Sequence, residues 1–240
     1  MITVYGIPTS LDELRRIPLV RPEKAGCRWK GVQHGEAVDA IIDETSTRGW
    51  SIGDMKFSLN KDNTELAGGM DLVIPEIDPP DGQRFSLGIL TSNARTRAMR
   101  LYVGTMISIC NNGMATGEMI LTRKHERTFN FVEELEPALD SYFLAAKQIP
   151  LMVERLKETK IGPSEAEHIL MEAGRRKLMP WAHIGLVDKE FRLPRHADHG
   201  SGTSWALLQS FTEIVKRSPP RMQMDAMNSF RDMLPLAVAA

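Results

Sequence analysis

The sequence predicts an α+β fold in which an antiparallel β-meander is packed by helices and followed by a helical C-terminal region. Three observations lead to this prediction. Met55, Phe57 and Leu59 alternate with polar residues and precede an Asp-Asn turn, a pattern typical of a β-hairpin. A turn-rich loop at residues 78–82 then separates this hairpin from another apolar stretch. Beyond residue 130, apolar residues recur mainly at helical spacing.

The N-terminal segment, residues 1–31, is expected to be an arm because three prolines interrupt it. Its one helical stretch, residues 10–16, begins with a serine N-cap and has Glu13 at the capping-box position. An amphipathic helix is expected over residues 35–48, and Gly49 ends its apolar periodicity.

Strands are predicted next at residues 55–59, 66–77 and 85–90. Short loops separate them, so the simplest arrangement is a three- or four-stranded antiparallel sheet. Residues 96–111 return to helical spacing and are predicted to form a helix, and residues 114–122 are a candidate for another strand.

A long helix is expected from Asn130, with Val132 among its inward-facing residues and with Pro150 kinking or breaking it. Further helices are expected at residues 164–177 and 204–217, on either side of a polar loop. The predicted domains are therefore an arm (1–31), an α+β core (32–160) and a helical C-terminal region (161–240).

Composition narrows the class of protein. The 240 residues carry a formal net charge of -1, so no global basic field indicates a nucleic-acid or membrane partner. Cys27 and Cys110 show neither disulfide-scaffold nor zinc-module spacing, which favours a reducing compartment. The chain also lacks a signal-peptide pattern and any long apolar run, so a cytoplasmic location is expected.

The densest local charge is basic and forms two clusters with only two acidic residues among them. If the strand near Met119 returns beside the first cluster, the two clusters can combine into a groove for a phosphate backbone. The alternative is a solvated charged face. The candidate nucleic-acid-binding residues are Arg95, Arg97, Arg100, Arg123, Lys124 and Arg127, with Asn93 at an anion-binding turn and Tyr102 as a flanking aromatic residue.

One other cluster suggests chemistry. His196, Asp198 and His199 fall within one turn and are weak candidates for a divalent metal site, although a plain polar loop is the favoured interpretation. No phosphate-binding loop and no nucleophile-elbow motif occurs. Neither a catalytic residue nor a cofactor is therefore predicted.

Several short segments resemble a family of phage- and plasmid-like proteins, domain of unknown function 932. The matching segments are Thr91–Asn93, Ile109–Asn112, Arg123–His125 and Thr203–Leu208. The sequence departs from the family pattern at Asn93–Arg97, where the turn is more basic.

The order of predicted elements also resembles the core of single-strand annealing proteins, the group of the eukaryotic Rad annealing protein and phage RecT, Red-beta and Erf. The order is a helix ending at Gly49, a hairpin, a third strand and an Arg-bearing helix. This resemblance implies non-enzymatic annealing of single-stranded DNA in phage or mobile-element recombination, inside a bacterial host cell. It also implies a homo-oligomeric ring or filament, no cofactor, no membrane, and a phage exonuclease or host single-strand binding protein as partner.

Two rival hypotheses belong to other classes. A protein-interaction or counter-defence factor would use methionine-rich helices as its contact surface, and near-neutral charge favours it. A metal-dependent nuclease would use the histidine loop.

Overall fold

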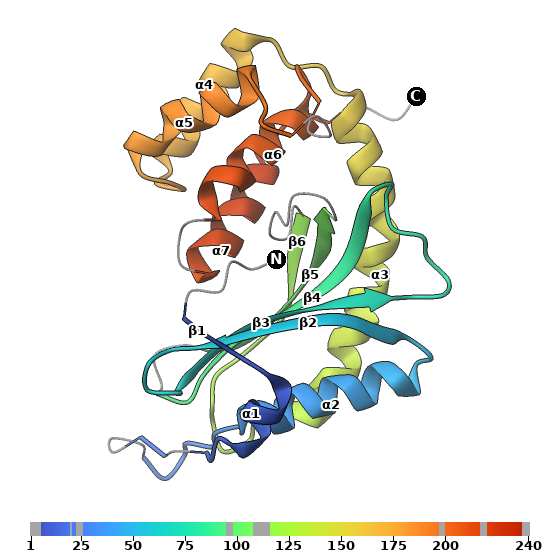
Figure 1. Cartoon of the computed structure of the whole chain (residues 1–240), viewed down its shortest axis with the longest axis vertical. Helices are drawn as coiled ribbons and strands as arrows, with labels where there is room; N and C mark the ends of the chain where they lie inside the picture. The colour runs from blue at the N-terminus through green and yellow to red at the C-terminus, as the bar shows by residue number, and fades with distance from the viewer. Residues whose placement is uncertain are drawn as a thin grey trace.

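The computed structural model describes residues 6–19, 21–22, 26–94, 98–107, 116–196, 200–216 and 220–236. A six-stranded antiparallel sheet with its strands in chain order forms the centre of the molecule (Figure 1). Each strand pairs with the next along the chain, so the predicted meander is confirmed and extended. The strands are β1 (Ile7–Thr9), β2 (Ser51–Leu59), β3 (Glu65–Val73), β4 (Gln83–Ser92), β5 (Met99–Ile107) and β6 (Thr116–Arg123).

The turn between β2 and β3 shows why the hairpin forms where the sequence predicts it. The Asn60 side-chain carbonyl accepts hydrogen bonds from the backbone N–H groups of Thr64, at 2.8 Å, and Glu65, at 3.0 Å. Asn63 adopts a φ of 55°, a left-handed conformation that asparagine tolerates better than most residues. This turn fixes the register in which Leu59 pairs with Leu66.

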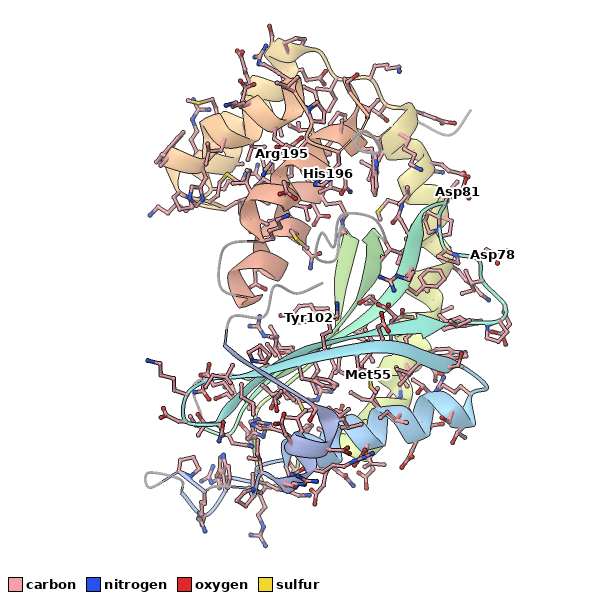
Figure 2. The ribbon with its side chains drawn as sticks, viewed as in Figure 1. Met55, Asp78, Asp81, Tyr102, Arg195 and His196 are labelled. Atoms are coloured by element: carbon pink, nitrogen blue, oxygen red, sulfur yellow. The ribbon has the colours of Figure 1, made fainter. Side chains whose placement is uncertain are left out.

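The two faces of the sheet differ in chemistry. The apolar face carries cross-strand rows such as Met70, Leu87 and Val103, all at most 1% exposed. The opposite face, here called the polar face, carries Arg100 and Tyr102. Small residues such as Ser86, Gly88 and Gly104 lie on the same face. Figure 2 shows Met55 and Tyr102 on opposite sides of the sheet. The period-2 pattern of the strands therefore separates a core from a second surface.

Helices cover the apolar face. α1 (Leu11–Arg16) packs on α2 (His34–Thr47), and α2 lies along β2 and contacts the long helix α3 (Phe131–Glu158). Trp50 holds this layer together, with its ring centroid 5.8 Å from that of Tyr142 and 5.9 Å from that of Phe143. The far end of α3 reaches the C-terminal helices, so one helix joins both layers (Figure 1).

The C-terminal helices form a second layer on the other side of the sheet (Figure 1). They are α4 (Pro163–Arg175), α5 (Trp181–Arg192), α6 (Ser204–Val215) and α7 (Pro220–Arg231). Every residue of α6 is buried, and Phe211 stacks on Phe230 of α7 with ring centroids 3.9 Å apart. α7 also contacts β6, which ties this layer to the sheet. Among the described residues, no helix is both long and apolar enough to cross a membrane.

The helix predicted at residues 96–111 is wrong, because the described part of this segment forms β5. Met99 and Val103 are four residues apart, a spacing that places side chains on one side of a helix and also on one face of a strand. Leu101, Tyr102 and Val103 are all at most 1% exposed, so burial on both faces hides the alternation that would reveal a strand.

Val132 is 64% exposed, so the inward position predicted for it in the long helix is wrong. α3 continues through Pro137 and Pro150, so Pro150 does not break the helix, and the kink expected there as the other possibility stays a prediction. Ile149 and Val153 are buried on either side of Pro150, and their packing offsets the backbone hydrogen bond that proline cannot donate.

Part of the predicted N-terminal arm belongs to the main fold. β1 pairs with β2, and Leu14 of α1 is completely buried. The predicted capping box is present, since the Glu13 N–H donates to the Ser10 hydroxyl at 3.2 Å and the Glu13 carboxylate accepts from the Ser10 N–H at 2.7 Å. The domain boundaries at residues 31 and 160 stay predictions.

Candidate nucleic-acid interface

Four exposed cations gather at one end of the sheet, where the chain turns from β2 to β3 and leaves β6. We call this surface the basic sheet end and define it as Arg28, Lys30, Lys124 and Arg127. Trp29 forms an antiparallel bridge with Glu126, and the Lys30 N–H donates to the His125 carbonyl at 3.5 Å. Two segments distant in sequence are thereby held side by side.

Local backbone bonds shape this surface. The N–H of Glu126 donates to the Lys124 carbonyl and that of Phe129 to the Glu126 carbonyl, both at 2.9 Å, so the chain turns tightly after β6. The Asn93 side-chain amide donates to the Val32 carbonyl at 3.0 Å. This bond ties the chain that leads into α2 to the end of β4. Trp29 is half-buried and lies against Gly31.

No ion pair neutralises the four cations of the basic sheet end within the part of the chain that the structure describes. Glu126 is the one acidic residue within the two bridged segments, residues 28–30 and 124–127. A surface of this kind has N–H donors and positive charge available for an anionic ligand.

Two buried histidines lie beneath this surface. His125 is 8% exposed, and its Nε2 lies 3.2 Å from the Thr91 hydroxyl, while its ring meets the edge of Phe129. His34, at the start of α2, is 2% exposed, and burial lowers its pKa to about 4. Burial likewise lowers the pKa of His125. Both imidazoles are therefore neutral at pH 7, and the positive charge resides in the four cations above them.

Arg100 and Tyr102, two of the predicted binding residues, form a link between the sheet and the C-terminal helices. The Arg100 Nη1 donates to the Tyr102 hydroxyl at 3.2 Å and to Asp225 of α7 at 3.2 Å. The Tyr102 hydroxyl and Asp225 both raise the pKa of Arg100. Tyr102 is completely buried, so its ring is not open to stacking with a base.

The remaining predicted residues divide into four groups. Arg123 forms an ion pair with Glu134 of α3 at 2.9 Å, on the opposite face of the sheet from Arg100. Asn93 is buried and has the structural role described above. Arg95 and Arg97 lie outside the described residues. Lys124 and Arg127 remain exposed and form half of the basic sheet end.

The metal prediction falls mostly outside the described residues, which include His196 but neither Asp198 nor His199. His196 follows Arg195 in the connection from α5 to α6 and lies beside α6 (Figure 2). No group of three His, Cys, Asp or Glu side chains within the described ranges is placed to hold a metal ion.

Sequence reasoning missed Arg28 and Lys30. Their signal is the short run Arg28-Trp29-Lys30, two cations around an aromatic residue, inside a segment expected to be an arm. Its proximity to residues 124–127 depends on a long-range bridge that no local pattern reveals.

A family model, Domain of unknown function (DUF932), matches residues 28–233. The chain belongs to this family. The match begins at Arg28, so the whole basic sheet end of this DUF932 protein lies within the family region. The predicted membership is confirmed over strands β2 to β6 and the C-terminal helices alike. No curated protein and no solved structure matches the chain.

Proposed function

We propose that this protein binds single-stranded DNA at the basic sheet end and anneals complementary strands without an enzymatic step. The observation that carries the proposal is the bridge between Trp29 and Glu126, which assembles four exposed cations on a chain whose net charge is only -1. A local basic surface on a near-neutral protein is the pattern expected when one region contacts phosphates.

Among the described residues, no exposed aromatic side chain lies beside the four cations, so base stacking is not expected to contribute to the proposed binding. Trp29 is half-buried, and Tyr102 is fully buried. Contacts would therefore fall on phosphates, which carry no sequence information, and the bases would stay open for pairing. This is the property that an annealing protein needs.

The sheet and the long helix support the annealing part of the proposal. A helix, a hairpin and a third strand occur in the expected order, and α3 packs on the sheet, but the expected Arg-bearing helix is the strand β5. The role in phage or mobile-element recombination, the ring or filament and the partner nuclease follow from the same resemblance and belong to the proposal.

The decisive experiment is fluorescence anisotropy of a labelled single-stranded oligonucleotide, titrated with protein over a range of salt concentrations. Each phosphate contact contributes a slope of about -0.7 in a plot of log affinity against log salt for single strands. Replacing Arg28, Lys30, Lys124 and Arg127 with glutamine should therefore weaken binding and flatten the slope by about three.

A double variant gives a matched control. Lys124→Gln with Arg127→Gln should lower the slope by about 1.4, whereas Lys147→Gln on α3 with Lys177→Gln, just beyond α4, should leave it unchanged. Equal slopes for both double variants would remove the basic sheet end from the proposal. Affinity for duplex competitor equal to that for single strands would argue against annealing.

The rival functions predict different results. A protein-interaction or counter-defence factor is supported by four exposed apolar side chains on or just beyond α4 and α5: Met171, Trp181, Leu186 and Leu193. It predicts a nuclease-resistant complex with a host protein and no salt-sensitive DNA affinity. A metal-dependent nuclease predicts bound metal in the purified protein and strand cleavage on addition of Mg²⁺ or Mn²⁺.

A further inference from the structure

A cavity of about 550 Å³ lies in the C-terminal helices, on α5, the connection that follows it, and α6. This volume is within the range of small-molecule binding sites. Four of its lining residues are apolar and three are charged. The lining residues are Leu186, Lys189, Glu190, Leu193, Pro194, Arg195 and Ile214.

Arg195 is the rigid polar group of this cavity (Figure 2). Its Nε donates to Glu190 at 2.6 Å, and its Nη2 lies 3.3 Å from the carboxylate of Glu213. The backbone N–H of Arg195 also donates to Glu190 at 2.9 Å. Both glutamates are less than 5% exposed, so the guanidinium is held by two buried carboxylates.

The Arg195 guanidinium also has N–H groups that are available to donate hydrogen bonds to a ligand. The Arg195 side chain is 48% exposed, and its Nη1 forms no hydrogen bond or ion pair within the described part of the chain. Lys189, exposed on α5, likewise has no ion-pair partner among the described residues. A fixed arginine fork with unused N–H groups is suited to a planar anion.

The net charge of the side chains that line the cavity indicates how many negative charges the ligand should carry. Among the described residues, the charged side chains that line the cavity are two cations, Arg195 and Lys189, and one carboxylate, Glu190. One positive charge is left over, which matches a singly charged anion better than a doubly charged phosphate. The apolar wall calls for a hydrocarbon part on the same ligand.

We propose that this cavity binds a monocarboxylate, with the carboxylate at Arg195 and Lys189 and the hydrocarbon part against Leu186, Leu193, Pro194 and Ile214. This ligand is either a free organic acid or the C-terminal residue of a peptide, since both have the same chemistry. The proposal is independent of DNA binding, because the cavity uses none of the cations at the basic sheet end.

The test is an NMR titration of the isotope-labelled full chain with octanoate and, as the uncharged isostere, octanamide. Octanoate should shift backbone amide signals of residues 186–195 and 214, and octanamide should bind about tenfold more weakly because it lacks the charge. No localised shift with octanoate, or equal affinities of the two compounds, would overturn the proposal.

Variants confirm the location. Leu193→Asp places a negative charge at the cavity and should abolish octanoate binding, and its side chain is 73% exposed, so the fold should tolerate the change. Leu144→Asp on α3, at a position 65% exposed, is the matched control and should bind octanoate normally. Equal octanoate affinities for the two variants would contradict the assignment of this cavity.

A further titration with a dipeptide distinguishes a free organic acid from a peptide C-terminus as the source of the carboxylate. Acetyl-Ala-Leu with a free C-terminus, compared with its amide, tests the peptide form. Tighter binding of the free-acid dipeptide than of octanoate would support the site and assign it to a chain end. Tighter binding of octanoate would support the site and assign it to a free acid.

Discussion

His34 shows how one buried side chain links the fold to pH. It lies 2% exposed at the start of α2, and its pKa falls to about 4 from an ordinary value of 6.5 because burial disfavours the charged imidazolium. In the unfolded chain the same imidazole gains a proton as the pH falls through 6.5. The unfolded state therefore binds more protons than the folded state between these two values.

The stability contributed by neutral His34 is fully present above pH 6.5 and is lost as the pH falls toward 4. The free energy of unfolding should decrease by on the order of 2 kcal/mol between about pH 7.5 and pH 5. Urea denaturation at the two pH values measures this change. The His34→Gln variant should show a smaller change, and an unaltered pH dependence in that variant would contradict the assignment.

At the scale of elements, the prediction of structure from sequence succeeds wherever a local signal is strong. The Asn60 turn, the Ser10 capping box and the loop at residues 78–82 are all local chemistry, and the elements they bound occur as predicted. β5 was missed because its two buried faces remove the alternation that distinguishes a strand from a helix. α5 was missed although Ile184, Val187 and Phe191 recur at helical spacing.

The candidate interface could be predicted only in part, because its composition depends on contacts between residues that are far apart in sequence. Lys124 and Arg127 lie in a basic run that composition alone reveals. Arg100 lies in a run of the same kind, but its partner Asp225 comes from a distant helix, and only the folded chain shows that this charge is paired. Arg28 and Lys30 join the interface through a bridge to a remote segment.

A prediction about α3 tests how the helix tolerates proline. Pro150 lies inside the helix and lacks the N–H that would otherwise bond to the Ala146 carbonyl. Pro150→Ala should raise the free energy of unfolding by about 1–2 kcal/mol, because alanine restores this bond and has the highest helix propensity. Thermal or urea denaturation measures the effect. A less stable variant would mean that packing of the proline ring outweighs the missing bond.

At the scale of the whole molecule, the Arg100 and Asp225 pair joins the polar face of the sheet to α7. Arg100→Ala should lower the free energy of unfolding by about 1 kcal/mol, because it leaves the buried Tyr102 hydroxyl with one bond fewer. A double-mutant cycle with Asp225→Ala should give a coupling of about 0.5 kcal/mol, as for a partly exposed ion pair.

The same variant separates the two roles assigned to Arg100. The salt dependence of DNA binding should be unchanged in Arg100→Ala, because its guanidinium is paired in the folded protein. A slope that flattens by about 0.7 would restore Arg100 to the DNA-binding surface.

The bridge between Trp29 and Glu126 makes the basic sheet end a product of tertiary structure. During synthesis, the two halves of this surface come together only after the chain beyond β6 has emerged. A nascent or unfolded chain would then lack the assembled charge, and recovery of DNA affinity during refolding would report the time at which this long-range contact closes.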